Sequence, residues 1–217
     1  MTCVNIIFDL DGTLTDSELG ITRCLIFALE RLGVAALERA QLRRYIGTPL
    51  RQVFGEMLAT SDSALIERAV ELYRERFGEV GLYENELYTG TAESLTHLRG
   101  SGHTLFLATA KAEVYARRVI EHFGLVSHFA GVYGAALSGE GSKKAELLAR
   151  LVSEEGIEPA ESVMIGDRGG DVAGARANRM RSIGVLWGYG TAEELVNADV
   201  RVATWAELVR EVRGMDA

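Results

Sequence analysis

The fold class of this chain is decided by the stretch Val4-Asn5-Ile6-Ile7-Phe8-Asp9-Leu10-Asp11-Gly12-Thr13. Its first half is short, almost entirely apolar and rich in β-branched residues, which is typical of a strand buried on both faces of a parallel sheet. Its second half changes abruptly to acidic and turn-forming residues. The sequence therefore predicts a core strand that ends in a polar loop, at the edge where doubly wound sheets bind their ligands.

Two aspartates in that loop, Asp9 and Asp11, are the candidate catalytic residues. An Asp-Gly pair between apolar residues is also the usual signal for a β-hairpin. We expect no second strand after Thr13, because a helical pattern begins almost at once, so the hairpin is the weaker interpretation. Two carboxylates placed two positions apart on a loop can divide the work of nucleophile and general acid/base.

The region from about Ser17 to Gly81 predicts helices only. Apolar residues recur there at spacings of three and four, from Ile21 to Leu32 and again from Leu65 to Phe77, as in amphipathic helices. After residue 88 the pattern changes to strands alternating with helices, which predicts a parallel sheet with right-handed crossovers. Further strands are expected at Thr104–Ala108, Gly131–Tyr133, Ser162–Ile165, Ser182–Leu186 and Val200–Val202.

We therefore predict an α/β fold with a doubly wound, Rossmann-like parallel sheet and an inserted α-helical cap domain. The catalytic core comprises residues 1–15 and 88–217, and the cap comprises residues 16–87. Hinges are expected at the two crossings, Thr15-Asp16-Ser17 and Tyr88-Thr89-Gly90. We call these two sets of residues the core and the cap.

Polar residues also follow other predicted strands. Thr109 ends a strand, where it is either a turn residue or the donor of a hydroxyl hydrogen bond to a phosphoryl oxygen. Lys143 and Lys144 open a helix, where each is either solvated surface or a point charge that neutralises an anion. Asp167 and Asp171 lie four residues apart across a glycine-rich turn. Either can cap a helix, or both can face one cavity and bind Mg²⁺, which prefers a few carboxylate oxygens.

The composition limits the choice of partner. The chain has 217 residues, a formal net charge of −8, 47% hydrophobic residues and 25% charged residues. No basic patch is available for a nucleic acid polymer, and an anionic substrate needs local positive charge from lysine or a metal ion. No stretch reaches the roughly 18 apolar residues of a membrane helix, and residues 1–5 lack a basic leader. We expect a cytoplasmic protein with reduced cysteines.

Four stretches of this sequence resemble, in order, the four motifs of the haloacid dehalogenase superfamily. They are Asp9-x-Asp11-Gly12-Thr13, Thr109, Lys144 and Gly166-Asp167-x-x-x-Asp171. The resemblance covers nearly the whole chain and is strongest to phosphoglycolate-phosphatase-like members with a helical cap. The stretch Gly81-Leu82-Tyr83-Glu84-Asn85-Glu86-Leu87-Tyr88 is similar to a subgroup described as 5′-nucleotidases. The resemblance implies a phosphoric monoester hydrolase that acts on a small phosphorylated metabolite.

The resemblance also implies a role for each acidic motif residue. Asp9 would attack phosphorus and become an aspartyl phosphate, while Asp11 would protonate the leaving oxygen and then activate water. Mg²⁺, the implied cofactor, would be held by the Asp9 carboxylate, the Asp11 backbone carbonyl and Asp167. Asp171 would support that set of ligands.

Thr109 and Lys144 would bind the phosphoryl group in such an enzyme. Lys144 is preferred to Lys143 because Lys-Ala-Glu-Leu-Leu is how this motif usually continues in the superfamily. The departure at Ala112, where relatives often place proline, affects only local loop geometry. In phosphoryl transfer, positioning and neutralisation of negative charge matter most, so these assignments are chemically sensible.

Two other functions stay open on the sequence. Mutases of the β-phosphoglucomutase kind keep both aspartates and a similar cap, and isomer exchange of a hexose phosphate would reveal them. A receiver-type signalling module combines similar residues on a doubly wound sheet. However, its phosphoaccepting aspartate would lie mid-chain and it has no helical insert.

One cap loop is expected to reach the site, Gly47-Thr48-Pro49-Leu50-Arg51, because it separates two predicted helices. Arg51, or Arg44 nearby, can pair with a substrate carboxylate, which would favour phosphoglycolate. The alternative for either arginine is a solvated helix surface. The similarity to 5′-nucleotidases instead favours a nucleoside packed on apolar cap residues.

Overall fold

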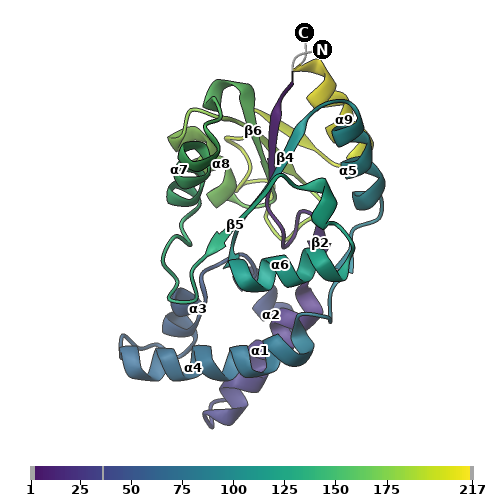
Figure 1. Cartoon of the computed structure of the whole chain (residues 1–217). Helices are drawn as coiled ribbons and strands as arrows, with labels where there is room; N and C mark the ends of the chain where they lie inside the picture. The colour runs from purple at the N-terminus through teal and green to yellow at the C-terminus, as the bar shows by residue number, and fades with distance from the viewer. Residues whose placement is uncertain (1–2, 36, 216–217) are drawn as a thin grey trace.

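The computed structural model describes residues 3–35 and 37–215, and its main sheet has six parallel strands (Figure 1). Their order is β5-β4-β1-β6-β7-β8, with β1 in the interior of the sheet. The strands are β1 (Asn5–Phe8), β4 (Thr104–Ala112), β5 (Gly131–Ala135), β6 (Ser162–Gly166), β7 (Arg181–Val185) and β8 (Val200–Val202). This topology confirms the predicted fold class, a doubly wound parallel sheet with a helical region.

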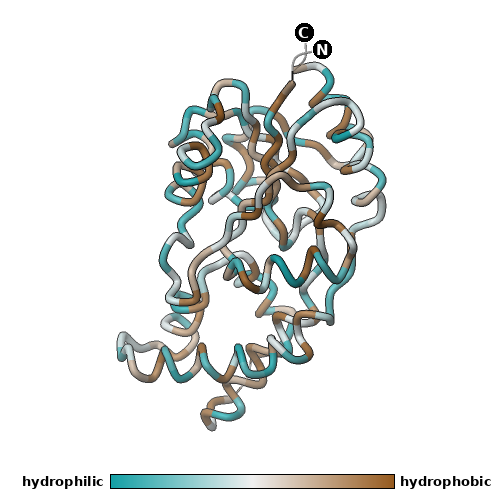
Figure 2. The backbone as a smooth tube through the Cα atoms, in the orientation of Figure 1, coloured by the Kyte–Doolittle hydropathy of each residue, from teal (hydrophilic) through white to brown (hydrophobic). Residues whose placement is uncertain are grey.

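Helices cover both faces of this sheet. They are α5 (Thr91–Gly100), α6 (Glu113–His122), α7 (Lys144–Glu155), α8 (Gly169–Ala177) and α9 (Trp205–Gly214). Ile7 of β1 packs with α7 and α8, whereas its neighbours Ile6 and Phe8 pack on the opposite face with α5, α6 and α9. Because both faces are covered, β1 is apolar throughout, and Figure 2 shows the central strands in brown.

The cap is helical, as predicted, and lies at the lower end of the molecule in Figure 1. α1 packs against α4, and α3 packs against the same helix. The cap helices are α1 (Glu18–Arg31), α2 (Arg39–Leu42), η1 (Arg43–Tyr45), α3 (Leu50–Met57), α4 (Ser63–Arg76) and η2 (Phe77–Gly81). No helix in residues 3–35 and 37–215 is long and apolar enough to cross a membrane.

Two short strands correct the expectation that the cap region is helical only. β2 (Thr15–Asp16) pairs with β3 (Glu86–Leu87) in an antiparallel ribbon where the chain leaves the core and returns to it. A strand therefore does follow Thr13, but its partner is β3 and not β1, so the first loop is still not a hairpin with β1. Strands of two residues have no periodicity that a sequence pattern can reveal.

The second long cap helix ends in one turn of π-helix. η2 continues α4 to Gly81, within the region where only helices are expected. Glycine is needed here, since a Cβ on Gly81 would lie 2.4 Å from Cys24 Sγ and one on Gly20 would lie 2.0 Å from the Gly81 oxygen. The two glycines let α1 approach η2 closely, which seats Phe77 at the inner face of the cap.

Candidate active site

The first loop starts where β1 ends, at the carboxyl edge of the sheet. The backbone N–H of Asp9 donates to the Ile165 oxygen of β6 at 2.9 Å, so the first aspartate still lies in register with the neighbouring strand. Gly12 then has φ +86°, and a Cβ there would lie 2.3 Å from Asp167 Oδ2. Glycine is therefore required for the loop to turn, and its turn allows Asp167 to approach.

Three buried carboxylates meet at this edge, from Asp9, Asp167 and Asp171. One oxygen of each lies within 4.8 Å of the others. Carboxylate oxygens gathered this closely are the donor set that a hard cation such as Mg²⁺ prefers, so these residues fit the implied metal.

Lys144 is the cation of this cluster. Its Nζ lies 2.8 Å from Asp171 Oδ1 and 3.1 Å from Asp9 Oδ1, and it donates to the Ala108 oxygen at 2.7 Å. Lys143, one residue earlier, points outward and is paired with Glu146 at the surface. The start of α7 therefore directs only the second of the two lysines toward Asp9.

Asp171 is held by the protein at both oxygens. While Oδ1 meets Lys144, Oδ2 accepts the backbone N–H of Arg168 at 3.0 Å, at the start of α8. Gly166 makes room for this carboxylate, because a Cβ there would lie 2.2 Å from Oδ2. Asp171 is thus fixed in position beside Asp9 and Asp167.

Asp167 is held by the loop that follows β7. Its Oδ2 accepts backbone N–H groups from Tyr189 at 2.7 Å and Gly190 at 3.3 Å, and its Oδ1 accepts the Thr13 hydroxyl at 3.4 Å. The approach is close, since a Cβ on Gly190 would lie 1.8 Å from the Asp167 backbone oxygen. Sequence analysis missed this loop, although its Gly-Tyr-Gly spacing is the signal of a backbone that approaches another group.

The same loop reaches the junction between core and cap. The Tyr189 hydroxyl donates to Asp16 Oδ1 at 2.8 Å and accepts the Ser17 backbone N–H at 2.7 Å. Tyr189 therefore connects one expected hinge directly to the carboxylate of Asp167.

Crowded burial changes the proton affinities of these groups. Burial, followed by the charges of Asp171 and Asp9, raises the pKa of Asp167 from 3.8 to about 7. Burial also raises the pKa of Asp171, against the neighbouring Lys144 ammonium. Burial lowers the pKa of Lys144, but the two carboxylates outweigh it and leave that pKa above its ordinary value. A divalent cation would relieve the repulsion among the carboxylates.

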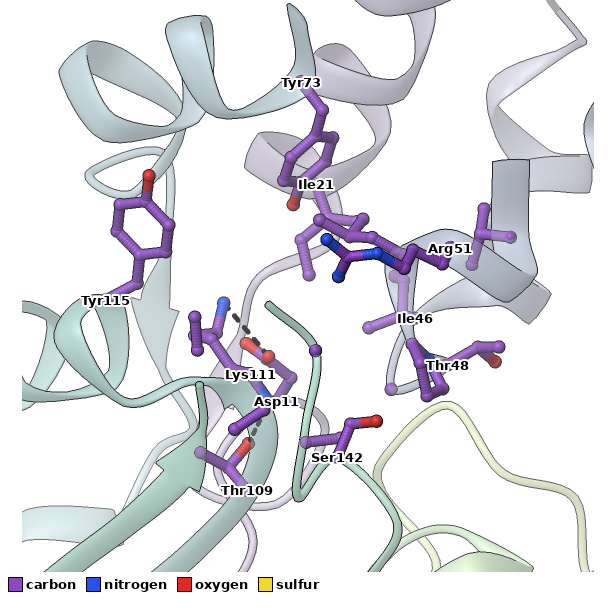
Figure 3. A pocket seen from close by; sticks show the side chains of 18 of the residues that line it. Asp11, Ile21, Ile46, Thr48, Arg51, Tyr73, Thr109, Lys111, Tyr115 and Ser142 are labelled. Carbon is purple, nitrogen blue, oxygen red and sulfur yellow. Dashed lines mark hydrogen bonds and ion pairs between the residues drawn. The ribbon is translucent and has the colours of Figure 1, made fainter. Parts of the chain in front are cut away.

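A pocket lies above this edge, between core and cap (Figure 3). Asp9, Asp11 and Thr109 lie on its core side. The Thr109 hydroxyl accepts the backbone N–H of Lys111 at 3.3 Å, and its own proton is free to donate to a ligand. The cap loop 47–51 also lines the pocket, as its position between two helices predicts.

Arg51 lines the pocket but is paired within the protein. It makes a two-point ion pair with Glu67 of α4, with Nη2 at 2.7 Å from Oε2. Arg44 is not among the pocket residues; its guanidinium carbon lies 4.9 Å from the Tyr45 ring centre. Arg51 is thus a pocket residue with a protein partner, and its pairing with a substrate carboxylate stays a prediction.

Sequence analysis missed Lys111, which lies in the same pocket. Its Nζ is 3.0 Å from Asp11 Oδ2, and both side chains are only 8% exposed (Figure 3). The available signal was its position, since Lys111 lies two residues after Thr109, at the carboxyl end of a strand where ligands bind in such sheets.

Comparison with known proteins agrees with this geometry. The family described as haloacid dehalogenase-like hydrolase matches residues 6–185. The chain is 46% identical over 191 residues to a 5′-nucleotidase of Pseudomonas aeruginosa, covering 88% of this chain and 86% of that protein. It is 36% identical over 208 residues to the tyrosine-protein kinase PtkA of Mycobacterium tuberculosis, covering 96% and 70%. It is 32% identical over 206 residues to a phosphoglycolate phosphatase of Chromobacterium violaceum, covering 93% and 92%.

Solved structures give the same result. A predicted phosphatase from Clostridium acetobutylicum superposes with a TM-score of 0.94 at 34% identity, covering 98% of this chain and 100% of that one. The fold, the sequence similarity and the arrangement of the aspartates around a buried lysine all indicate the same family. The chain belongs to the haloacid dehalogenase-like hydrolases.

Proposed function

We propose that the protein is a Mg²⁺-dependent phosphatase that hydrolyses phosphomonoesters of small metabolites through an aspartyl phosphate on Asp9. The observation that carries this proposal is the placement of Asp9. It is buried at the end of β1, 3.1 Å from the Lys144 ammonium and beside two further carboxylates, at the core side of a pocket. A nucleophile for phosphorus needs this combination of fixed position and neutralised charge.

Mg²⁺ would be held by the Asp9 carboxylate, the Asp11 backbone carbonyl and Asp167, with Asp171 holding Lys144 and the local geometry in place. When bound, the cation supplies charge neutralisation for the phosphoryl oxygens and the nucleophile. The cluster of Asp9, Asp167 and Asp171 oxygens within 4.8 Å of one another supports this assignment. Burial, followed by the charges of Asp171 and Asp9, raises the pKa of Asp167, and a bound cation would offset this cost to the charged carboxylate.

The protein groups would act in two steps. Asp9 attacks phosphorus while Asp11 gives its proton to the leaving oxygen, and water then hydrolyses the aspartyl phosphate after losing a proton to Asp11. Thr109 donates its hydroxyl proton to a phosphoryl oxygen, and Lys144 offsets the negative charge on the same group. The buried position of Lys144 between Asp9 and Asp171 supports its role over that of Lys143.

We further propose that residues 1–15 and 88–217 form the catalytic unit and that the cap, residues 16–87, selects the substrate. All the proposed chemical groups come from the core, whereas the cap contributes the opposite side of the pocket. That side is largely apolar and aromatic, with Ile21, Leu25, Ile46, Tyr73 and Phe77. The cap arginines at the pocket have protein partners. Arg51 pairs with Glu67, and Arg74 donates to the Leu137 oxygen at 2.5 Å.

A substrate carboxylate would have to share these guanidinium groups with their protein partners, whereas a nucleoside would pack on the apolar side chains. The pocket therefore favours a 5′-nucleotide over phosphoglycolate as the substrate class.

The test is phosphate release from phosphoglycolate, nucleoside monophosphates, sugar phosphates and an aryl phosphate, for the wild type and Asp9→Asn. The amide is nearly isosteric but is a poor nucleophile, so kcat should fall by ~10³-fold or more while the fold is retained. Turnover by Asp9→Asn within tenfold of the wild type would refute the proposal. Phosphate transfer from ATP to a tyrosine peptide, with no phosphate release to water, would identify a kinase instead.

A further inference from the structure

Lys111 has no role in the proposed reaction, yet it is one of the most constrained cations at the pocket. Its Nζ lies 3.0 Å from Asp11 Oδ2 and 4.5 Å from the centre of the Phe77 ring. Asp11 belongs to the core and Phe77 to the cap, so the ammonium group lies between the proposed acid/base and the cover of the site. A cation over an aromatic face is attracted by the ring, and more strongly where water is excluded.

The backbone is shaped to place this lysine. The pairing of β4 with β5 shifts register between Thr109 and Ala112, which is a bulge at Ala110 and Lys111. Bulges re-aim side chains and occur often beside active sites. Gly134 of β5 permits the irregularity, since a Cβ there would lie 2.8 Å from the Lys111 backbone oxygen.

The ion pair uses only half of the Asp11 carboxylate. Oδ2 meets Lys111, whereas Oδ1 is buried and has no hydrogen-bond partner within residues 3–35 and 37–215. A carboxyl group held at one oxygen is restricted in rotation, and its other oxygen is left to exchange a proton with a ligand. Proton transfer depends strongly on such alignment.

We propose that Lys111 is a positioning residue that holds Asp11 by Oδ2, so that Oδ1 delivers the proton to the leaving oxygen, and that Phe77 shields this ion pair. The inference rests on the proposed function. The Asp11 carboxyl first takes up a proton from solvent. As the bond between phosphorus and the leaving oxygen breaks, Asp9 bonds to phosphorus and this proton moves from Asp11 Oδ1 to that oxygen. The carboxylate left on Asp11 is then neutralised by the Lys111 ammonium.

The experiment uses the leaving group to isolate this step. The value of kcat/KM reports only the steps up to formation of the aspartyl phosphate. An aryl phosphate whose leaving group is an acidic phenol needs little proton donation in those steps, whereas an alkyl phosphate needs it fully. Lys111→Met should therefore lower kcat/KM for an alkyl phosphate monoester by ~10²-fold but for p-nitrophenyl phosphate by less than about tenfold. Lys111→Arg keeps the charge and should restore most of the loss.

Two comparisons make the result specific. In an Asp11→Asn background, Lys111→Met should cost little more, because a residue that acts through Asp11 has nothing left to position. Lys143→Met, at an exposed lysine, is the matched control and should change neither substrate's kcat/KM. Circular dichroism and thermal midpoints establish that each variant is folded; if Lys111→Met is not, Lys111→Arg and Lys111→Gln carry the same comparison.

Equal losses on both substrates would overturn the inference and show that Lys111 acts as general positive charge. So would an unchanged kcat/KM, or losses that add fully to those of Asp11→Asn. Each of these outcomes leaves wild-type phosphatase activity in place, so it is distinguishable from failure of the proposed function, in which Asp9→Asn would stay active.

Discussion

The core side and the cap side of the pocket are built in opposite ways. On the core side, buried carboxylates and lysines from separate strands, loops and helices meet within hydrogen-bonding distance. On the cap side, helices contribute apolar and aromatic side chains, and the arginines there are already paired. The reaction needs charged side chains held in fixed positions. Binding different leaving groups needs a pocket wall whose shape can vary without moving those charged side chains.

The comparison predicts that changes on the core side affect every substrate, whereas changes on the cap side affect substrates unequally. It also predicts that stability is distributed differently. Buried carboxylates on the core side repel one another without a cation, whereas the cap helices pack through buried apolar residues and are joined by ion pairs such as Arg76 with Glu84. Four measurements test these expectations.

The largest effect is expected on removing the cation. After dialysis against a strong chelator, activity on all substrates should be lost and then restored by Mg²⁺, while excess Ca²⁺ should inhibit because it accepts more ligands at longer distances. The thermal midpoint should also rise with Mg²⁺ in the wild type and hardly at all in Asp167→Asn. Full activity in the chelated protein would contradict the assignment of the core side.

A smaller loss is expected from the lysine that contacts Asp9. Lys144→Ala should lower kcat/KM by ~10²-fold or more on every substrate, because a buried ammonium no longer offsets charge at the phosphoryl group. Lys143→Ala should have little effect, since that side chain is at the surface. Steady-state assays of both variants measure these losses of kcat/KM. A larger loss for Lys143→Ala than for Lys144→Ala would show that α7 directs the other lysine toward the phosphoryl group.

A substrate-dependent effect is expected from the cap loop. Arg51→Ala should lower kcat/KM for a nucleoside monophosphate about tenfold and for an aryl phosphate less, because the loop loses its anchor on α4. Glu67→Gln weakens the same ion pair and should give the same pattern. If Arg51→Ala instead impairs phosphoglycolate most and Glu67→Gln improves it, the arginine binds a substrate carboxylate. Equal effects on all substrates, or none, would remove this loop from substrate selection.

The smallest effect is expected on stability. Arg76 and Arg23 donate to Glu84, and the hydrogen bond from Arg76 is the main cause that lowers the pKa of this carboxyl below 4.5. A lowered folded-state pKa stabilises the protein above about pH 4.5, and this contribution is lost as pH falls through the folded-state pKa.

Glu84→Gln should therefore reduce the free energy of unfolding by about 1.5–3 kcal/mol at pH 7 and by less below pH 4.5, measured by urea denaturation. Glu71→Gln is the control, because its pair with Arg68 is mostly exposed and should contribute little. A constant difference between wild type and Glu84→Gln at all pH values would contradict the role of this ionised carboxyl.

Local patterns determined much of this protein. The apolar run that became β1, the alternation of strands and helices, and the three-four periodicity of α1 and α4 were all readable, because each depends on neighbours in the chain. The location of Asp9, Asp11 and Asp167 at one edge of the sheet was readable for the same reason, since each lies in a loop after an apolar strand and the carboxyl ends of parallel strands share one edge.

Only the tertiary structure decided the partners of those residues. The Lys111–Asp11 ion pair, the Tyr189 contact with both Asp167 and Asp16, and the Arg51–Glu67 pair each join segments that come together only on folding. The ribbon of β2 and β3 was missed because two-residue strands carry no pattern of their own. Which side chains form such contacts depends on how whole helices and strands pack against one another. The positions of these elements are set by the buried core that all of them share.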